Sequence, residues 1–103
     1  MNKWFCVSDY TEVEPEEGGC YKIYICNILT HKKELFYIGT AINLRRRLEI
    51  HPVKTKLRNI FSYPNYIWVE CKIILDNKKR LNEEKRLIKK YNPPMNTAFA
   101  RIK

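Results

Sequence analysis

Alternating apolar and polar residues predict three strands in this chain. Residues 20–28, CYKIYICNI, form the first, and residues 35–38 form the second. The polar residues 30–34 join these two as a hairpin with a fairly long loop. Residues 66–74 alternate well enough to be a third strand, which extends the hairpin into a sheet. An apolar patch at residues 4–7 is a candidate for a short edge strand.

A helical period predicts three helices between and after these strands. The first covers about residues 43–50, with Asn43 as its N-cap and Pro52 enforcing its end. The second is short, at about residues 53–61. The last covers about residues 77–91, where an Asp-Asn pair offers the N-cap and an Asn-Pro-Pro sequence stops the helix.

The first helix carries three consecutive arginines that the helical period separates. Only Arg47 falls on the apolar stripe, together with His51 one turn later. Arg45 and Arg46 point toward solvent. A guanidinium on the inward stripe needs an anionic partner, whereas its two neighbours can be hydrated. We therefore expect Arg47 to have a specific anionic partner.

One glutamate of the last helix also falls on its apolar stripe. This stripe consists of Leu81, Leu87, Ile88 and Tyr91. Glu84 lies within it, while Glu83 is displaced by about 100° around the helix. An inward carboxylate must coordinate a metal or meet a cation such as Arg47, because an unpaired buried charge is costly. A buried Arg47–Glu84 ion pair without chemical function is the equally weighted alternative.

Length and charge favour a single domain that binds a polyanion. The chain has 103 residues, a length that a single hydrophobic core can stabilise. Its net charge is +9. Residues 1–17 form an acidic segment with one basic and five acidic residues, so residues 18–103, the expected domain, are strongly cationic. Nucleic acid is the commonest soluble partner of such a surface, and a merely solvated surface is the alternative.

The cysteines do not predict a metal site or a secreted protein. Four are present, and they form no CxxC pair and have no histidine cluster beside them, which argues against structural zinc. Two disulfides are arithmetically possible. Because no signal peptide is evident and each cysteine lies in an apolar run, we expect buried thiols in a cytoplasmic or other DNA-containing intracellular compartment. No apolar run reaches the ~20 residues that span a bilayer, so we expect no membrane association.

Five sequence elements in order resemble the GIY-YIG nuclease domain. They are Gly19-Cys20-Tyr21, Tyr37-Ile38-Gly39, the Arg47 and His51 pair, Glu84, and Pro93-Pro94-Met95-Asn96. Any one tripeptide is a weak signal, but five elements with near-family internal spacing are a strong one. The resemblance extends over about residues 18–97, nearly the whole chain, so it indicates a small stand-alone member.

The resemblance implies an α+β fold, with a small three-stranded antiparallel sheet flanked by helices, and a metal-dependent endonuclease that hydrolyses DNA phosphodiester bonds. Known members act in homing, excision repair, cleavage of DNA junctions and restriction, so a role in DNA repair or recombination is implied. Carried over residue by residue, the active site would consist of Tyr21, Tyr37, Arg47, His51, Glu84 and Asn96.

Three of these residues carry the main roles that the resemblance implies. Glu84 would hold a single Mg²⁺, with Mn²⁺ as an alternative, and the ion would stabilise the leaving oxygen. Arg47 would contact the phosphoryl oxygens with its planar fork. Tyr21 would be the general base, which requires nearby cations because the pKa of an unperturbed tyrosine is about 10.

The remaining three have supporting roles, each with a structural alternative. Tyr37 would hydrogen-bond the water or phosphate, although both tyrosines could be ordinary strand aromatics. His51 would steady Tyr21 or relay a proton, or it could simply cap the end of the first helix. Asn96 would fix the local backbone, or be a turn residue after the prolines. Gly39 is interpreted as a backbone requirement at the turn that follows its strand.

Three departures from the family pattern bear on these assignments. Cys20 replaces the usual aliphatic residue, which a core should tolerate. Tyr21 and Tyr37 are several residues further apart than is common, which we assign to a longer loop at residues 30–34. A shifted register would turn Tyr21 to the other sheet face. Thr40 stands where some members have lysine, so cationic help for the base must come from elsewhere, such as Lys22 or the metal.

Three hypotheses follow. The leading one is a nuclease that chooses structured or branched DNA by shape, or through a specificity-providing protein partner. Its phosphate contacts would be Lys22, Arg45, Arg46, Lys54, Lys56 and Arg58. The second is a nucleic-acid-binding module with the same fold and little or no catalysis. The third is that the acidic segment, from Asp9 to Glu17, covers the basic face or recruits a partner.

Overall fold

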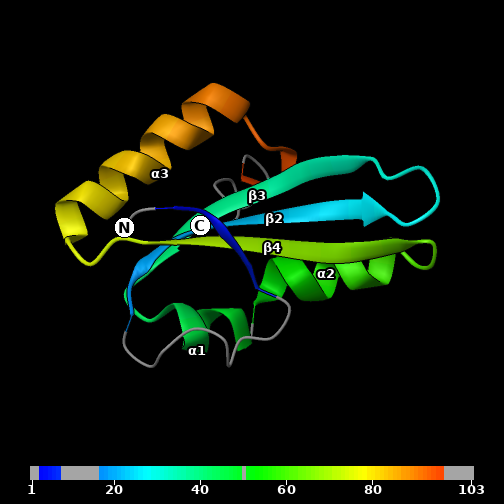
Figure 1. Cartoon of the computed structure of the whole chain (residues 1–103), viewed down its shortest axis with the longest axis horizontal. Helices are drawn as coiled ribbons and strands as arrows, with labels where there is room; N and C mark the ends of the chain where they lie inside the picture. The colour runs from blue at the N-terminus through cyan, green and yellow to red at the C-terminus, as the bar shows by residue number, and fades with distance from the viewer. Residues whose placement is uncertain (1–2, 8–16, 50, 97–103) are drawn as a thin grey trace.

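The computed structural model describes residues 3–7, 17–49 and 51–96 of the chain. Within these ranges the elements are β1 (Phe5–Val7), β2 (Gly19–Asn27), β3 (Lys33–Ala41), α1 (Leu44–Glu49), α2 (Pro52–Ile60), β4 (Asn65–Ile73) and α3 (Asn77–Tyr91). Four antiparallel strands form one sheet in the order β1-β4-β2-β3. Figure 1 shows α3 on one side of this sheet and α1 and α2 on the other.

The α+β class and the antiparallel sheet with flanking helices are confirmed. The sheet has a fourth strand besides the expected three, because the candidate edge strand at residues 4–7 forms β1, which pairs with β4 and places Val7 opposite Val69. The acidic residues 8–16 lie outside the described residues, so the division between an acidic segment and a single domain stays a prediction. None of the described helices combines the length and the apolar character needed to cross a membrane.

The main core lies between the sheet and the α1–α2 face. It is built from apolar side chains that alternate on the strands and recur at helical spacing on α1 and α2, among them Tyr21, Ile23, Tyr37, Leu44, Leu48, Val53 and Leu57. Each fully buried side chain of this size contributes about 1.5–3 kcal/mol to folding. Cys20, Cys26 and Cys71 are buried as expected, whereas Cys6 is exposed.

The β2–β3 hairpin differs from the prediction in its length and its register. Both strands have nine residues, and the loop between them consists of residues 28–32, two positions earlier than the expected residues 30–34 and of the same length. A register shift follows Ile23, where Ile23 pairs with Tyr37 but Tyr24 pairs with Leu35, so β3 carries one extra residue. Longer strands and this bulge therefore account for the wide spacing of the two motif tyrosines.

Pro52 lies at the start of the second helix, whereas we expected it to enforce the end of the first. It is the first residue of α2, where a proline loses no hydrogen bond because the first N–H groups of a helix have no partner within it. Asn43 caps α1 as predicted, since its side-chain oxygen accepts from the Arg46 N–H at 3.0 Å. Asp76 likewise caps α3 by accepting from the Lys79 N–H at 2.9 Å.

The buried face of α3 is rotated from the predicted apolar stripe. Arg80 and Leu87 are buried, whereas Leu81 and Tyr91 are exposed. The predicted stripe left out Arg80, because arginine is rarely buried. Its guanidinium instead donates to the Ile74 carbonyl at 2.8 Å, which satisfies the buried charge group with backbone acceptors at the end of β4.

Candidate active site

Tyr21 lies against Gly39 of the neighbouring strand, and this contact defines the site. The two residues are directly paired across β2 and β3. A Cβ on Gly39 would come within 2.9 Å of Cε2 of Tyr37 and within 2.5 Å of Cζ of Tyr21, closer than real Cβ atoms come to their neighbours. Because β3 is the edge strand, the missing side chain lets the Tyr21 ring cross it and bring the hydroxyl to the edge of the sheet. Gly39 is needed for this space and not, as we expected, for the turn.

His51 connects Tyr21 to the start of α2. Its Nε2 lies 2.6 Å from the Tyr21 hydroxyl, and its Nδ1 accepts from the Val53 N–H at 3.1 Å. Only 3% of the residue is exposed. His51 is therefore the N-cap of α2, not the cap of the first helix that we considered as an alternative.

These two contacts fix the tautomer of His51. A backbone N–H can only donate, so Nδ1 must carry a lone pair and the ring proton of the neutral form must be on Nε2. Nε2–H consequently donates to the Tyr21 oxygen. Burial, followed by the charges of Arg47 and Lys54, lowers the pKa of His51 from 6.5 to about 4, so the ring is neutral at physiological pH.

Arg47 reaches the same oxygen from α1. Its Nε donates to the Tyr21 hydroxyl at 3.5 Å, a long hydrogen bond. The side chain is otherwise exposed, which corrects the prediction that helical period buries it and obliges it to have an anionic partner. It lines a groove of about 490 Å³ together with Thr40, Ala41, Ile42, Asn43 and Arg46.

Tyr37 and Asn96 complete the side of the cluster on β3. The Tyr37 ring lies 6.1 Å from that of Tyr21 and 5.4 Å from that of His51, measured between centroids. The amide of Asn96 accepts from the Ile38 N–H at 2.9 Å and donates to the Ile38 carbonyl at 2.7 Å. Asn96 therefore holds the backbone between Tyr37 and Gly39.

The charge of Glu84 raises the pKa of both Tyr21 and Tyr37. Burial is the largest cause that raises the pKa of Tyr21 and of Tyr37, and the charge of Glu84 raises both further while Arg47 opposes it. The carboxylate of Glu84 thus belongs electrostatically to the cluster, although it comes from α3 on the other side of the sheet. Without additional positive charge, both tyrosines are protonated near neutral pH.

The donor set fits a hard divalent cation with few protein ligands. Among the described residues, no three His, Cys, Asp or Glu side chains are grouped as a metal site. A zinc centre needs such a group, whereas Mg²⁺ is commonly held by one or two carboxylates and keeps several waters. Glu84 is half-buried and its charge raises the pKa of both tyrosines, so it can supply that single carboxylate.

The proposed phosphate contacts differ in accessibility. Arg46, Lys56 and Arg58 are exposed on α1 and α2, and Arg45 and Lys54 are partly exposed. Lys22 is only 8% exposed, and its ammonium lies 4.1 Å from the centroid of the Trp4 ring. Lys22 is therefore not the open surface cation that we expected, and it lies on the opposite sheet face from Tyr21.

The sequence interpretation missed the neighbour of Glu84. Glu83 was placed about 100° away from the apolar stripe, but its side chain is only 13% exposed and contacts Lys72 at 2.7 Å. Arg86 is the main cause that lowers the pKa of Glu83 to about 2, and Lys72 adds to it. The sequence does show two adjacent glutamates and a lysine on the preceding strand. It does not show that Glu83 pairs with Lys72, because this contact depends on how α3 lies on the sheet.

Comparison with protein families identifies one match over most of the chain. The model of the GIY-YIG catalytic domain matches residues 17–97 of the 103 residues. No curated protein and no solved structure matches the chain. The match includes every residue of the cluster described above.

The contact between Tyr21 and Gly39 predicts strong coupling between the two positions. Gly39→Ala should destabilise the protein by about 1–3 kcal/mol, because the added methyl group overpacks the site. In a Tyr21→Ala background the same change should cost much less. The free energies of unfolding of the four proteins in this double-mutant cycle, measured in urea, give the coupling. Additive costs would show that the ring does not occupy this space.

The lowered pKa of His51 predicts acid sensitivity in a defined range. Because the unfolded chain protonates His51 near 6.5 and the folded protein only near 4, stability present above pH 6.5 is lost as the pH falls toward 4. The total loss is about 3 kcal/mol. His51→Asn keeps an N-cap acceptor but does not titrate. Its free energy of unfolding should therefore fall less than that of the wild type between about pH 6.5 and 5, where carboxylates contribute little. Urea unfolding across this range measures the effect, and equal slopes for both proteins would contradict it.

Proposed function

Because the chain belongs to the GIY-YIG catalytic domain family, a family of nucleases, we propose that it is a divalent-metal-dependent DNA endonuclease whose active site is the cluster around Tyr21. The observation that carries this proposal is the Tyr21 hydroxyl at the sheet edge, with His51 donating to it at 2.6 Å and Arg47 at 3.5 Å. Two donors on one phenol oxygen suit a group that must become anionic during a reaction.

Tyr21 is the proposed general base. Since His51 and Arg47 both donate to its oxygen, the hydroxyl proton of Tyr21 is directed away from them. Burial keeps this proton in place in the free protein, so Tyr21 becomes a base only when further positive charge stabilises its anion. The phenolate would then accept a proton from the attacking water while both donors hold it in position.

His51 steadies Tyr21 and does not relay its proton. Accepting a proton from Tyr21 would require a lone pair on Nε2, but the cap on α2 places the lone pair on Nδ1. The low pKa of His51 also opposes a second proton on the ring. Of the two roles that the resemblance allows, the geometry therefore favours hydrogen-bond donation.

Arg47 is the proposed phosphate contact. The guanidinium is anchored to Tyr21 by one nitrogen, and its exposed remainder faces the groove beside α1. A guanidinium there can pair with two non-bridging oxygens and stabilise charge that grows on them in the transition state. Tyr37 lies next to it and would hydrogen-bond the water or the phosphate.

Glu84 is the proposed ligand of one Mg²⁺ or Mn²⁺, which when bound supplies Lewis acidity at the scissile phosphate and stabilises the leaving oxygen. Asn96 contributes by holding Ile38, and with it the strand that carries Tyr37 and Gly39.

DNA would be held mainly through its phosphates. The exposed cations of α1 and α2 lie on the side of the sheet that carries Tyr21, and the net charge is +9. Such contacts position a duplex but do not read its sequence. We therefore propose that the shape of structured or branched DNA, or a protein partner, provides the choice of substrate.

Cleavage of DNA tests the proposal. Supercoiled, branched and single-stranded DNA should be cut in Mg²⁺ or Mn²⁺ and left intact in EDTA. Glu84→Gln and Tyr21→Phe should each lower the rate at least about a hundredfold, because each removes a group that acts on the reacting atoms. Glu34→Gln is the matched control, since it removes an exposed carboxylate from the other end of β3.

Equal rates for wild type and Glu84→Gln would refute the assignment of the active site. Salt-dependent binding of DNA by the wild type, with no cleavage of any substrate in either metal, would instead support the alternative of a non-catalytic nucleic-acid-binding module.

A further inference from the structure

Two adjacent glutamates flank the buried face of α3. Arg80 and Leu87 mark the centre of that face, because both are buried and lie about two turns apart on the helix. With about 100° between successive residues, Glu83 lies roughly 50° to one side of this centre and Glu84 roughly 50° to the other. A rotation of α3 by about 100° about its axis would exchange which glutamate faces the active site, so the orientation of the helix decides between them.

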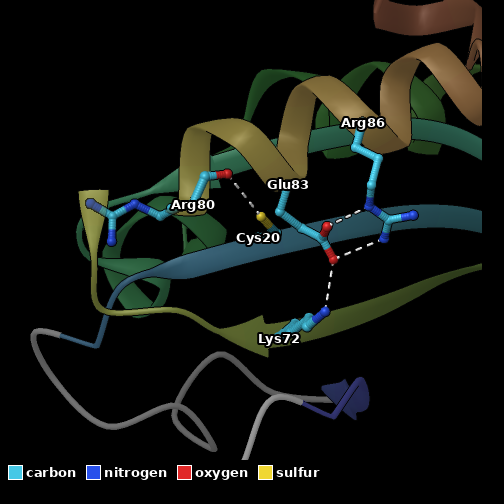
Figure 2. Close-up of polar contacts among 5 residues, drawn as sticks. All are labelled: Cys20, Lys72, Arg80, Glu83 and Arg86. Atoms are coloured by element: carbon cyan, nitrogen blue, oxygen red, sulfur yellow. Dashed lines mark hydrogen bonds and ion pairs between the residues drawn. The ribbon is translucent and has the colours of Figure 1, made fainter. Parts of the chain in front are cut away.

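Glu83 is held by three hydrogen bonds from two cations. Its Oε2 accepts from Nζ of Lys72 at 2.7 Å and from Nη2 of Arg86 at 3.1 Å, while its Oε1 accepts from Nε of Arg86 at 2.7 Å. Figure 2 shows the carboxylate of Glu83 pointing down to Lys72 on β4, with Arg86 reaching back from the next turn of α3. Both carboxylate oxygens already accept hydrogen bonds from cations, and the charges of Lys72 and Arg86 oppose the binding of a metal ion at Glu83.

The pairing with Lys72 is sheltered from solvent. The side chains of Glu83 and Lys72 are 13% and 18% exposed, whereas Arg86 is 57% exposed. An ion pair at such low exposure is screened much less than a surface pair, and removing one partner leaves the other poorly solvated. Lys72 is thus the contact that ties α3 to the sheet, and Arg86 orients the carboxylate from the helix itself.

A second attachment lies one turn earlier on α3. The Cys20 thiol on β2 donates to the backbone carbonyl of Arg80 at 3.5 Å, and Figure 2 shows this contact beside Glu83. The Arg80 guanidinium also donates to the Ile74 carbonyl at 2.8 Å. Attachments on neighbouring turns prevent the helix from rolling, as a single attachment would not.

The order of the strands determines which strand Glu84 faces once Glu83 is attached to β4. In the sheet, β4 lies on one side of β2 and β3 lies on the other. Glu83 is drawn toward β4 through Lys72, so Glu84, on the opposite flank of the helix, is turned toward β3. This is the strand that carries Tyr37 and Gly39.

We propose that Lys72, Glu83 and Arg86, here named the Glu83 clamp, set the rotation of α3 and thereby make Glu84 the carboxylate of the active site. Glu83 and Lys72 are positioning residues in this proposal, because they act through Glu84 and touch neither metal nor DNA. The inference rests on the proposed metal-dependent cleavage and adds which side chains align its metal ligand.

Binding of Mn²⁺, followed by electron paramagnetic resonance of the free ion, tests the clamp without relying on catalysis. Lys72→Met and Glu83→Gln should each weaken Mn²⁺ binding about tenfold, the lower end of the range for residues that orient metal ligands. Cleavage by both variants should approach the wild-type rate when the metal concentration is raised, because the clamp aligns Glu84 and performs no chemistry.

Lys33→Met is the matched control. Lys33 also pairs with a glutamate on the sheet, Glu70 at 3.1 Å, and its ammonium lies over the rings of Tyr24 and Trp68 on the strands. The substitution removes the same charge as Lys72→Met, so any loss of DNA affinity through net charge should be equal in both. Mn²⁺ binding by Lys33→Met should match that of the wild type.

Circular dichroism and thermal unfolding establish that each variant is folded. Lys72→Met leaves Arg86 on Glu83, so it remains decisive even where Glu83→Gln does not fold. Wild-type Mn²⁺ affinity and metal dependence in a folded clamp variant would overturn the clamp. A wild-type protein that cuts no DNA in either metal would overturn the proposed function instead, so the two failures are distinct.

Discussion

The hydrogen bond between His51 and Tyr21 joins the fold of this protein to its proposed chemistry. His51 uses one ring nitrogen to cap α2 and the other to donate to the Tyr21 hydroxyl at 2.6 Å. The start of a helix and the position of the Tyr21 oxygen therefore depend on the same buried ring. The contact is possible only because Gly39 leaves room for the tyrosine ring to cross the edge strand. A change at any of these three positions should disturb the others.

Burial and nearby charge at this site oppose ionisation of Tyr21 in the free protein. Burial raises the pKa of Tyr21 and lowers that of His51, so both are uncharged near neutral pH. Arg47 remains as the cation beside them, and Glu84 adds negative charge that opposes ionisation of the tyrosine. Positive charge brought to Glu84 would relieve this opposition. The proposed dependence on a divalent cation thus has a physical basis in the resting charges of the cluster.

The sequence alone predicted the elements well and their contacts less well. Helix caps at Asn43 and Asp76 are local features, so the chain pattern reveals them, and the family motif orders the site residues along the chain. The predicted buried face of α3 was wrong because Arg80 is buried, whereas a hydrophobic pattern counts every arginine as a surface residue. The need for a residue without a side chain at Gly39 comes from contacts between distant segments, and so does the pairing of Glu83 with Lys72. Periodicity does not encode such contacts.

The tautomer of His51 tests this account most directly, because the role of Tyr21 follows from the direction of their hydrogen bond. Nitrogen-15 NMR of the imidazole at neutral pH distinguishes a protonated from an unprotonated ring nitrogen. The account predicts a neutral ring with its proton on Nε2 and a bare Nδ1. This state should be unchanged in Arg47→Lys, whereas Tyr21→Phe should keep the tautomer but lose the hydrogen bond from Nε2–H to the tyrosine oxygen. A proton on Nδ1, or a doubly protonated ring, would contradict it.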